Sequence, residues 1–206
     1  MSEDVIRTVD ELRDVVGHPL PRTRDKVTDR LDEVHRRWLE HTPFVVLATA
    51  GSEGRTDASP KGDPPGQLVH VIDERTVALA ERPGNRRVDG YLNVLDNPHA
   101  GLVCIIPGRG DTLRINGRAR LVRDAPWFDE MVVKGHRPLL ALVIDVEEVF
   151  FHCAKAFMRS RMWHPDDWDP TAVSSRAEIA QLLERPDETI EALEEYYGSQ
   201  YSTGLY

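Results

Sequence analysis

Two short segments of this sequence carry the residue types best suited to binding chemistry. Residues 58–66 hold Ser59, Lys61 and Asp63 in a stretch rich in glycine and proline. Residues 82–87 read Arg-Pro-Gly-Asn-Arg-Arg. Guanidinium groups and free backbone amides at a helix start together match the geometry of a phosphate. We therefore predict that the two segments meet and hold a phosphate group of a ligand.

The second segment is predicted to open a helix. Asn85 is a favourable N-cap residue, and apolar residues recur at helical spacing from Val88 to Leu95. This prediction places Arg86 and Arg87 in the first turn, at the positive end of the helix dipole. Two cations are unfavourable at that position unless an anion lies among them, which again indicates a phosphate.

Length and composition limit the class of protein. The chain has 206 residues, of which 40% are hydrophobic and 30% charged, as in an ordinary globular domain with extensions. The net charge of −9 argues against binding to nucleic acid or anionic lipid. No apolar run is long enough to cross a bilayer, and the N-terminus is unlike a secretory signal. Two cysteines are typical of a reducing compartment, so we expect a cytoplasmic protein.

The elements that must position these residues are mostly strands. Short β-branched or alternating runs predict seven strands, at residues 44–50, 55–61, 68–72, 76–81, 99–106, 112–122 and 140–151. The first is expected to be buried on both faces, and Pro60 restricts the second to an edge. At Glu147 and Glu148 the alternation changes parity, which indicates a β-bulge.

Helices are expected at both ends of the chain. One helix is predicted over 5–16, a longer one from Thr23 to Pro43, and one behind the capping box of Ser175 and Glu178. The fold class is thus mainly β, a closed or partly closed antiparallel barrel with helical extensions. We divide the chain into an N-terminal extension (1–43), a barrel domain (44–153) and a C-terminal segment with a helical tail (154–206).

Common catalytic motifs are absent from the sequence. It has no nucleophile elbow around Ser59, no His-Glu-x-x-His, no Cys-x-x-Cys and no glycine-rich nucleotide loop. We therefore predict neither a metal site nor a catalytic side chain.

Several segments in order resemble the pyridoxamine 5'-phosphate oxidase-like flavoprotein superfamily. They are Val-Leu-Ala-Thr-Ala-Gly-x-x-Gly-Arg (46–55), Asp-Ala-Ser-Pro-Lys-Gly-Asp (57–63), Arg-Pro-Gly-Asn-Arg-Arg (82–87), Asn-Pro-His-Ala-Gly-Leu (97–102) and Leu-Arg-Ile-Asn-Gly-Arg-Ala (113–119). Residues 150–160 with Trp163 resemble one uncharacterised subfamily. The resemblance covers roughly residues 40–165 and implies a six- to seven-stranded split β-barrel, a homodimer that binds FMN at the subunit interface.

The resemblance also implies roles for individual residues. Ser59 and Lys61 would line the flavin ring edge and phosphate, and Asn85, Arg86 and Arg87 would grip the phosphate. Thr112 would match a polar residue that reaches the cofactor across the dimer. Three further residues match only loosely the C-terminal cofactor contacts of the oxidase: His152, Lys155 and Trp163. The substrate-binding arginine motif of the vitamin B6 oxidase is not recognisable, which argues against that substrate.

Three functions follow as hypotheses. The first is an FMN-dependent oxidoreductase acting on a small molecule, in which Asp63 faces the substrate; a variant would use the deazaflavin F420. The second is a non-catalytic protein that sequesters a flavin or haem. The third is a partner-binding protein that uses the acidic tail helices.

Overall fold

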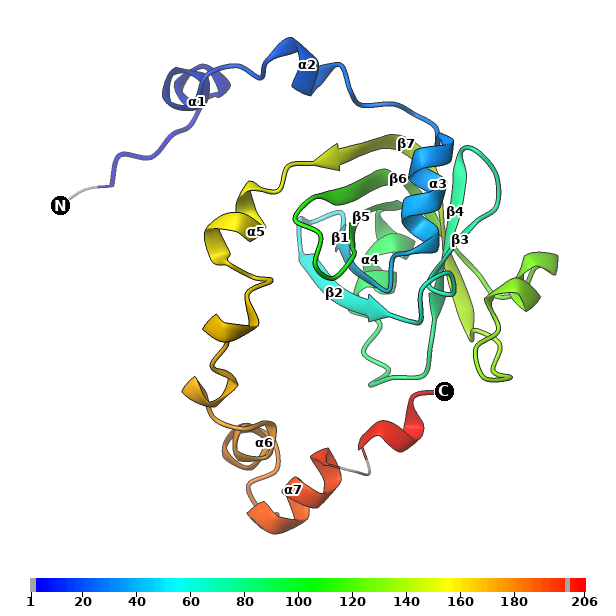
Figure 1. Ribbon diagram of the computed structural model, residues 1–206, viewed down its shortest axis with the longest axis vertical. Helices are drawn as coiled ribbons and strands as arrows, with labels where there is room; N and C mark the ends of the chain where they lie inside the picture. The colour runs from blue at the N-terminus through cyan, green and yellow to red at the C-terminus, as the bar shows by residue number, and fades with distance from the viewer. Residues whose placement is uncertain (1–2, 199–200) are drawn as a thin grey trace.

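The computed structural model describes residues 3–198 and 201–206. Seven strands form one antiparallel sheet in the order β2-β1-β5-β6-β7-β4-β3, curled into a barrel (Figure 1). The strands are β1 (Phe44–Ala50), β2 (Thr56–Gly62), β3 (Val69–Val71), β4 (Thr76–Glu81), β5 (His99–Ile105), β6 (Thr112–Val122) and β7 (Leu140–His152). The predicted mainly-β split barrel is therefore confirmed, and β2 lies at the sheet edge as Pro60 requires.

Side chains that alternate along the strands form the hydrophobic core inside the barrel. Leu47 of β1, Leu102 of β5 and Ile115 of β6 each lie on the inner face and are fully buried. On the outer face of β1 the side chains are exposed or half-buried. The prediction that β1 is buried on both faces was wrong, because nothing among the described residues fully covers the outer face of this strand.

The parity change predicted in β7 is confirmed as a β-bulge. Asn116 pairs with Glu148 and Gly117 with Val146, so Glu147 has no partner across the ladder. A β-carbon on Gly117 would lie 2.1 Å from the backbone oxygen of Asp145, so only glycine allows β6 and β7 to approach here.

The long helix predicted from Thr23 to Pro43 is not formed. Instead a short α2 (Pro21–Arg24) and α3 (Glu33–Glu40) are separated by an irregular stretch of turns and bends, with one isolated β-bridge at Thr28. Within that stretch the Leu31 amide donates to the carbonyl of Glu74, a tertiary bond that helical geometry would prevent. Asp32 then caps α3 in a box with His35.

The remaining helices lie mostly outside the barrel. α1 (Val9–Val16) begins at a capping box of Thr8 and Glu11. Past β7 the chain forms α5 (Lys155–Ser160), α6 (Arg176–Leu183) and α7 (Ile190–Tyr197), with 3₁₀ turns at 126–131, 165–167, 170–172 and 201–204. Ser175 and Glu178 cap α6 as predicted.

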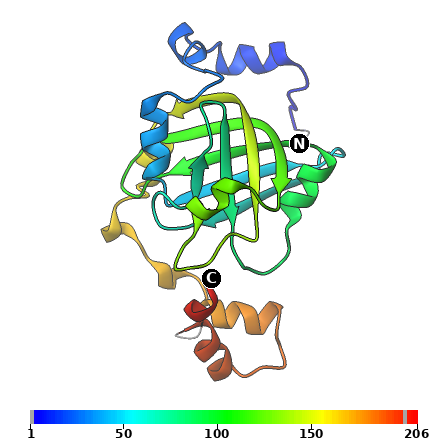
Figure 2. The same cartoon turned by 90° about the vertical axis from the view of Figure 1, so that its right-hand side faces the viewer.

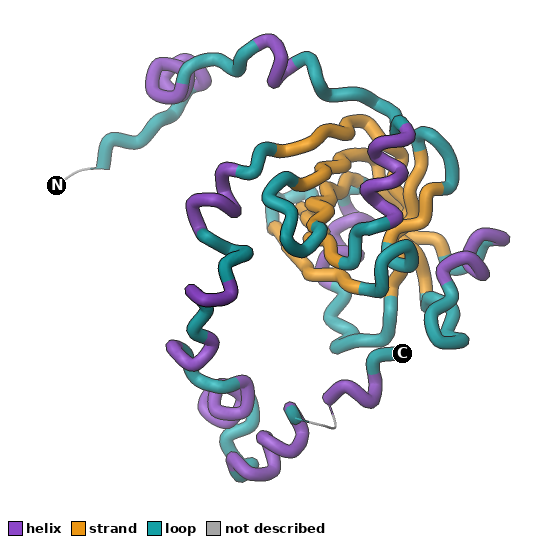
Figure 3. The backbone as a smooth tube through the Cα atoms, in the orientation of Figure 1, coloured by secondary structure: helices purple, strands orange, loops and turns teal. Residues whose placement is uncertain are grey.

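Both ends of the described chain project from the barrel as arms. The N-terminal helices extend from one side of the barrel (Figures 1 and 2). The C-terminal helices extend from another side, and the chain then turns back so that its end lies near the barrel. Strands gather in the barrel and most helices lie in the arms (Figure 3). None of the described helices is long and apolar enough to cross a membrane. The proposed domain limits at 43 and 153 stay a prediction.

Side chains, not backbone, close one seam of the barrel. β2 is hydrogen-bonded to β1 alone, and β4 to β3 and β7. Two ion pairs nevertheless join β2, and the residue that follows it, to the end of β4: Lys61 with Glu81, and Asp63 with Arg82, each at 2.6 Å. The seam between edge strand β2 and the end of β4, the next-to-last strand in the sheet order, is therefore bridged by these two ion pairs.

Candidate functional site

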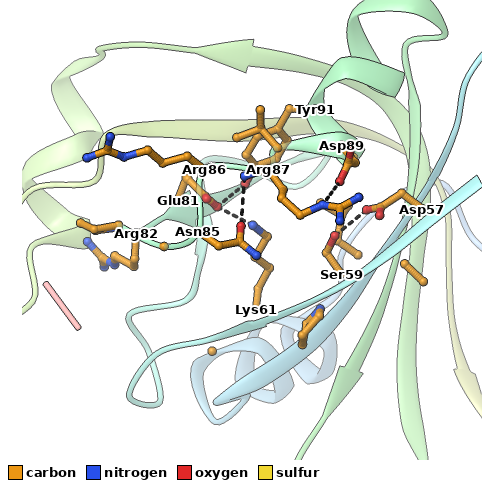
Figure 4. Close-up of a pocket in the computed structure, with 18 of the residues that line it drawn as sticks. Asp57, Ser59, Lys61, Glu81, Arg82, Asn85, Arg86, Arg87, Asp89 and Tyr91 are labelled. Atoms are coloured by element: carbon orange, nitrogen blue, oxygen red, sulfur yellow. Dashed lines mark hydrogen bonds and ion pairs between the residues drawn. The ribbon is translucent and has the colours of Figure 1, made fainter. Parts of the chain in front are cut away.

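A cavity of about 450 Å³ opens at this seam. Its walls are the inner face of β2, the end of β4, the loop 82–88 and the start of α4 (Asp89–Asp96). Ser59 and Lys61 come from the first predicted segment, and Asn85, Arg86 and Arg87 come from the second (Figure 4). The structure therefore brings together five of the residues singled out from the sequence.

Lys61 forms the central ion pair of the cavity. Its ammonium nitrogen lies 2.6 Å from Oε2 of Glu81, and the hydroxyl of Tyr91 donates to the same oxygen over 2.5 Å. The Lys61 nitrogen also lies 4.8 Å from the centroid of the Tyr91 ring. Burial, followed by the hydrogen bond to Glu81, raises the pKa of Tyr91 well above its usual value. The phenol is therefore fixed as a neutral donor to the carboxylate.

Arg87 is held by two neighbours along the chain. Its Nε lies 2.7 Å from Oδ2 of Asp89, and its backbone N–H donates to the side-chain oxygen of Asn85 over 3.0 Å. The hydrogen bond to Asp89 raises the pKa of Arg87. Close by, the Ser59 hydroxyl donates to Asp57 over 2.5 Å (Figure 4). This side of the cavity therefore already contains two carboxylates.

The predicted start of the helix was wrong by several residues. α4 begins at Asp89 with Val88 as its N-cap, so Arg86 and Arg87 lie in the loop before it. The cause is the Asn85 side chain, which closes a turn onto the residue two positions later rather than capping a helix. Two arginines in the first helical turn, as the sequence suggested, are therefore not present.

The buried face of α4 also differs from the prediction. Val88, Leu92 and Leu95 are exposed, whereas Gly90, Tyr91 and Val94 face the barrel. The loop before the helix is strained, since Arg86 and Val88 both have left-handed backbone angles, with φ of 61° and 48°. The second is the rarer case because valine is β-branched.

Gly90 explains why α4 lies so close to β2. A β-carbon at this position would lie 2.9 Å from Oδ2 of Asp57 and 3.4 Å from the hydroxyl of Thr49. A larger residue would push Asp57 away from Ser59. Glycine therefore lets the first turn of α4 form a wall of the cavity.

The charges that line the cavity are nearly balanced. Cations come from Lys61, Arg82, Arg86 and Arg87, and carboxylates from Asp57, Glu81 and Asp89. Of these cations, Arg86 has no carboxylate partner within the part of the chain that the structure describes. An incoming anion would therefore find one free guanidinium and would compete with carboxylates for the others.

Asp63 occupies a different environment from the one predicted. Its carboxylate is almost completely buried, accepts from Nε of Arg82 over 2.6 Å, and does not line the cavity. Arg82 also donates from Nη2 to the carbonyl of Met131 over 2.7 Å. The pair fixes the rim of the cavity and leaves Asp63 no direct access to a ligand there.

Four other residues named from the sequence do not line this cavity within one chain. Thr112 pairs with His152 across β6 and β7, and Lys155 begins α5. The indole N–H of Trp163 donates to the carbonyl of Arg109 over 2.7 Å. Arg109 in turn lines a second hollow of about 560 Å³, together with Trp38, Ile106 and Phe151.

Sequence reasoning missed the acidic side of the cavity. Asp57, Ser59 and Lys61 alternate along β2 and so share one face, a signal that was available from the strand period alone. Glu81 gives no comparable signal, because its position depends on how far the sheet curls. Among the described residues, no group of three or more His, Cys, Asp or Glu could hold a metal ion.

Comparisons with known proteins identify the family of this chain. The family model described as Pyridoxamine 5'-phosphate oxidase matches residues 31–153, more than half of the chain. No curated protein matches. One similar solved structure is HupZ of Group A Streptococcus, with 17% identity, a TM-score of 0.46, and coverage of 59% of this chain and 93% of that one.

Two further solved structures are similar at the same low level. PhzG of Burkholderia lata, in complex with tetrahydrophenazine-1-carboxylic acid, is 16% identical, with a TM-score of 0.42 and coverage of 65% and 84%. A pyridoxamine 5'-phosphate oxidase-related, FMN-binding protein of Nostoc punctiforme is 14% identical, with a TM-score of 0.38 and coverage of 57% and 79%. On the family match over residues 31–153, the chain belongs to the pyridoxamine 5'-phosphate oxidase family.

Proposed function

We propose that this protein binds FMN with its phosphate in the seam cavity and acts as an oxidoreductase on a small molecule. The supporting observation is that Ser59, Lys61, Asn85, Arg86 and Arg87, from two separate segments, line one cavity. Hydroxyl, amide, ammonium and guanidinium groups are the donors that a phosphate monoester accepts. The residues present therefore fit the phosphate end of the cofactor.

The chain's own residues would bind and orient the cofactor. Arg86, which has no carboxylate partner among the described residues, would meet the phosphate first, and Ser59 would turn its hydroxyl from Asp57 toward it. Lys61 would share its charge between Glu81 and the ligand. A bound flavin would supply the hydride or electron transfer, and no side chain need act as acid or base.

The loosely matched residues fit the same proposal if two copies associate. Thr112, His152, Lys155 and Trp163 do not line the seam cavity of their own chain. A homodimer would allow them to approach the partner's cavity, so we propose this assembly, in a reducing cytoplasm that keeps Cys104 and Cys153 as free thiols. Light scattering during size-exclusion chromatography tests the dimer.

The test of cofactor binding is a titration. Purified protein, and apoprotein reconstituted with FMN, should show a flavin absorption band, and the charge-reversed variant Arg86→Glu/Arg87→Glu should lose it. The matched control is Arg22→Glu/Arg24→Glu, which makes the same charge change on exposed α2 away from the cavity. Equal FMN affinity in both variants would overturn the assignment of the site.

Turnover is a separate question from binding. A flavin-loaded protein that is reduced by a nicotinamide and reoxidised by oxygen or a small acceptor supports the oxidoreductase. A protein that binds FMN or haem but is never reduced would instead be a sequestering protein. Hydride transfer only with reduced F420 would identify that cofactor in place of FMN.

A further inference from the structure

A second polar corner lies beside the seam cavity and is not explained by the proposed function. Its base is Asp63, whose side chain is 1% exposed, and its wall is Arg82, whose side chain is 10% exposed. Arg82 is fixed by its bonds to Oδ2 of Asp63 and to the carbonyl of Met131. Because Arg82 also lines the seam cavity, the corner and the cavity share a wall.

The other oxygen of Asp63 is used by the far end of the described chain. The hydroxyl of Tyr206 donates to Oδ1 of Asp63 over 3.0 Å, although the two residues are 143 positions apart in sequence. In the close-up, faint red C-terminal ribbon passes beside Arg82 (Figure 4). The returning arm of Figure 1 thus contacts the barrel through the side chain of Tyr206.

The Tyr206 ring is surrounded by groups that bind aromatic faces. The Arg82 guanidinium carbon lies 5.8 Å and the Lys134 nitrogen 5.2 Å from the ring centroid. The ring of His136 is stacked nearby, with centroids 6.2 Å apart and planes inclined by 28°. Two cations, one stacked ring and one carboxylate acceptor therefore meet around one phenol.

This set of contacts selects a particular ligand class. Asp63 has one oxygen committed to Arg82, so the other accepts a bond from a hydroxyl donor and repels an anion. The flanking cations favour an electron-rich ring. We propose that the corner is a binding site for a neutral phenol and that Tyr206 is its tethered occupant, released when an external hydroxyaromatic molecule takes its place.

Protonation of the phenol agrees with this assignment. Partial burial and the bond to Asp63 raise the pKa of Tyr206, while Arg82 acts in the opposite direction with a smaller effect. Lys134 and His136 are the other titratable groups that face the ring. The contact is therefore present while the tyrosine is neutral and is lost when its hydroxyl ionises.

Competition with a small phenol tests the proposal on the full-length chain. In Tyr206→Ala the corner is vacated, so 4-methylphenol should bind at least tenfold more tightly than to the wild type, measured by calorimetry or ligand-observed NMR. Toluene, which lacks the hydroxyl, should show no such gain. Leu205→Ala is the matched control, because it truncates an exposed neighbour and leaves Tyr206 in place.

Two further variants keep the test decisive. Tyr206→Phe retains the ring and removes only the bond to Asp63, so its affinity for 4-methylphenol should lie between those of the wild type and Tyr206→Ala. Adding His136→Ala to Tyr206→Ala should reduce the gain, because one wall of the corner is lost. An unchanged affinity in Tyr206→Ala, or an equal gain for toluene, would overturn the proposal, whether or not FMN binds.

Discussion

Replacing Glu81 by glutamine should tighten the binding of a phosphate-bearing ligand in the seam cavity. The Glu81 side chain is only 16% exposed and lies 2.6 Å from the Lys61 nitrogen, so its charge is weakly screened by solvent. Glutamine has nearly the same shape and can still accept a hydrogen bond from Tyr91. The change therefore removes a negative charge and frees Lys61 with little loss of packing.

The size of the effect follows from the dimensions of the cavity. A volume of about 450 Å³ is roughly 10 Å across, and over such a distance an effective dielectric constant of about 20 to 40 gives a repulsion of about 1 to 2 kcal/mol per unit of ligand charge. Since about 1.4 kcal/mol is a factor of ten in affinity, Glu81→Gln should lower the Kd for FMN about five- to thirtyfold for each unit of negative charge on its phosphate.

Calorimetric titration of the apoprotein with FMN, and separately with inorganic phosphate, measures this change. Glu53→Gln is the control, because it alters the net charge equally in the exposed hairpin between β1 and β2. Weaker binding in Glu81→Gln would mean that the carboxylate holds Lys61 in place for the ligand rather than competing with it. Equal binding in both variants would refute the electrostatic reasoning altogether.

Three further predictions concern stability and reactivity. Gly117→Ala would force a β-carbon against backbone and should destabilise the protein by about 3 kcal/mol or more, whereas Gly84→Ala, with open space around it, should cost under about 1 kcal/mol in chemical denaturation. Val88→Asn should raise the melting temperature, because asparagine tolerates the left-handed conformation that costs valine about 1 kcal/mol. Burial raises the pKa of the Cys104 thiol to about 12, so a thiol reagent at pH 8 should modify exposed Cys153 alone, and both cysteines only after denaturation.

The barrel was predictable because each strand can be recognised from the pattern of its own residues. Alternation along β6 is a local pattern that corresponds to its pairing with β7. The change in alternation near Glu147 is also local, and it corresponds to the β-bulge in β7. The helix from Thr23 was mispredicted for the opposite reason. Its apolar spacing is genuine, but the bond from Leu31 to the carbonyl of Glu74 comes from another part of the chain.

The site was predictable only in part. Ser59 and Lys61 share a strand face, and Asn85 marks a turn, so their participation follows from local sequence. Whether Asn85 caps a helix or closes a turn onto Arg87 depends on where α4 packs. The position of Glu81 opposite Lys61 depends on the curl of all seven strands, which no local pattern encodes.

The charged seam also has a consequence for the way the barrel opens. Because β2 is bonded through its backbone to β1 alone, separating it from β4 requires only the rupture of side-chain pairs such as Lys61 with Glu81. A molecule bound there would act as a cross-link between β2 and the end of β4. Hydrogen exchange of the β2 amides should then slow on ligand addition, while exchange in central β6 stays unchanged.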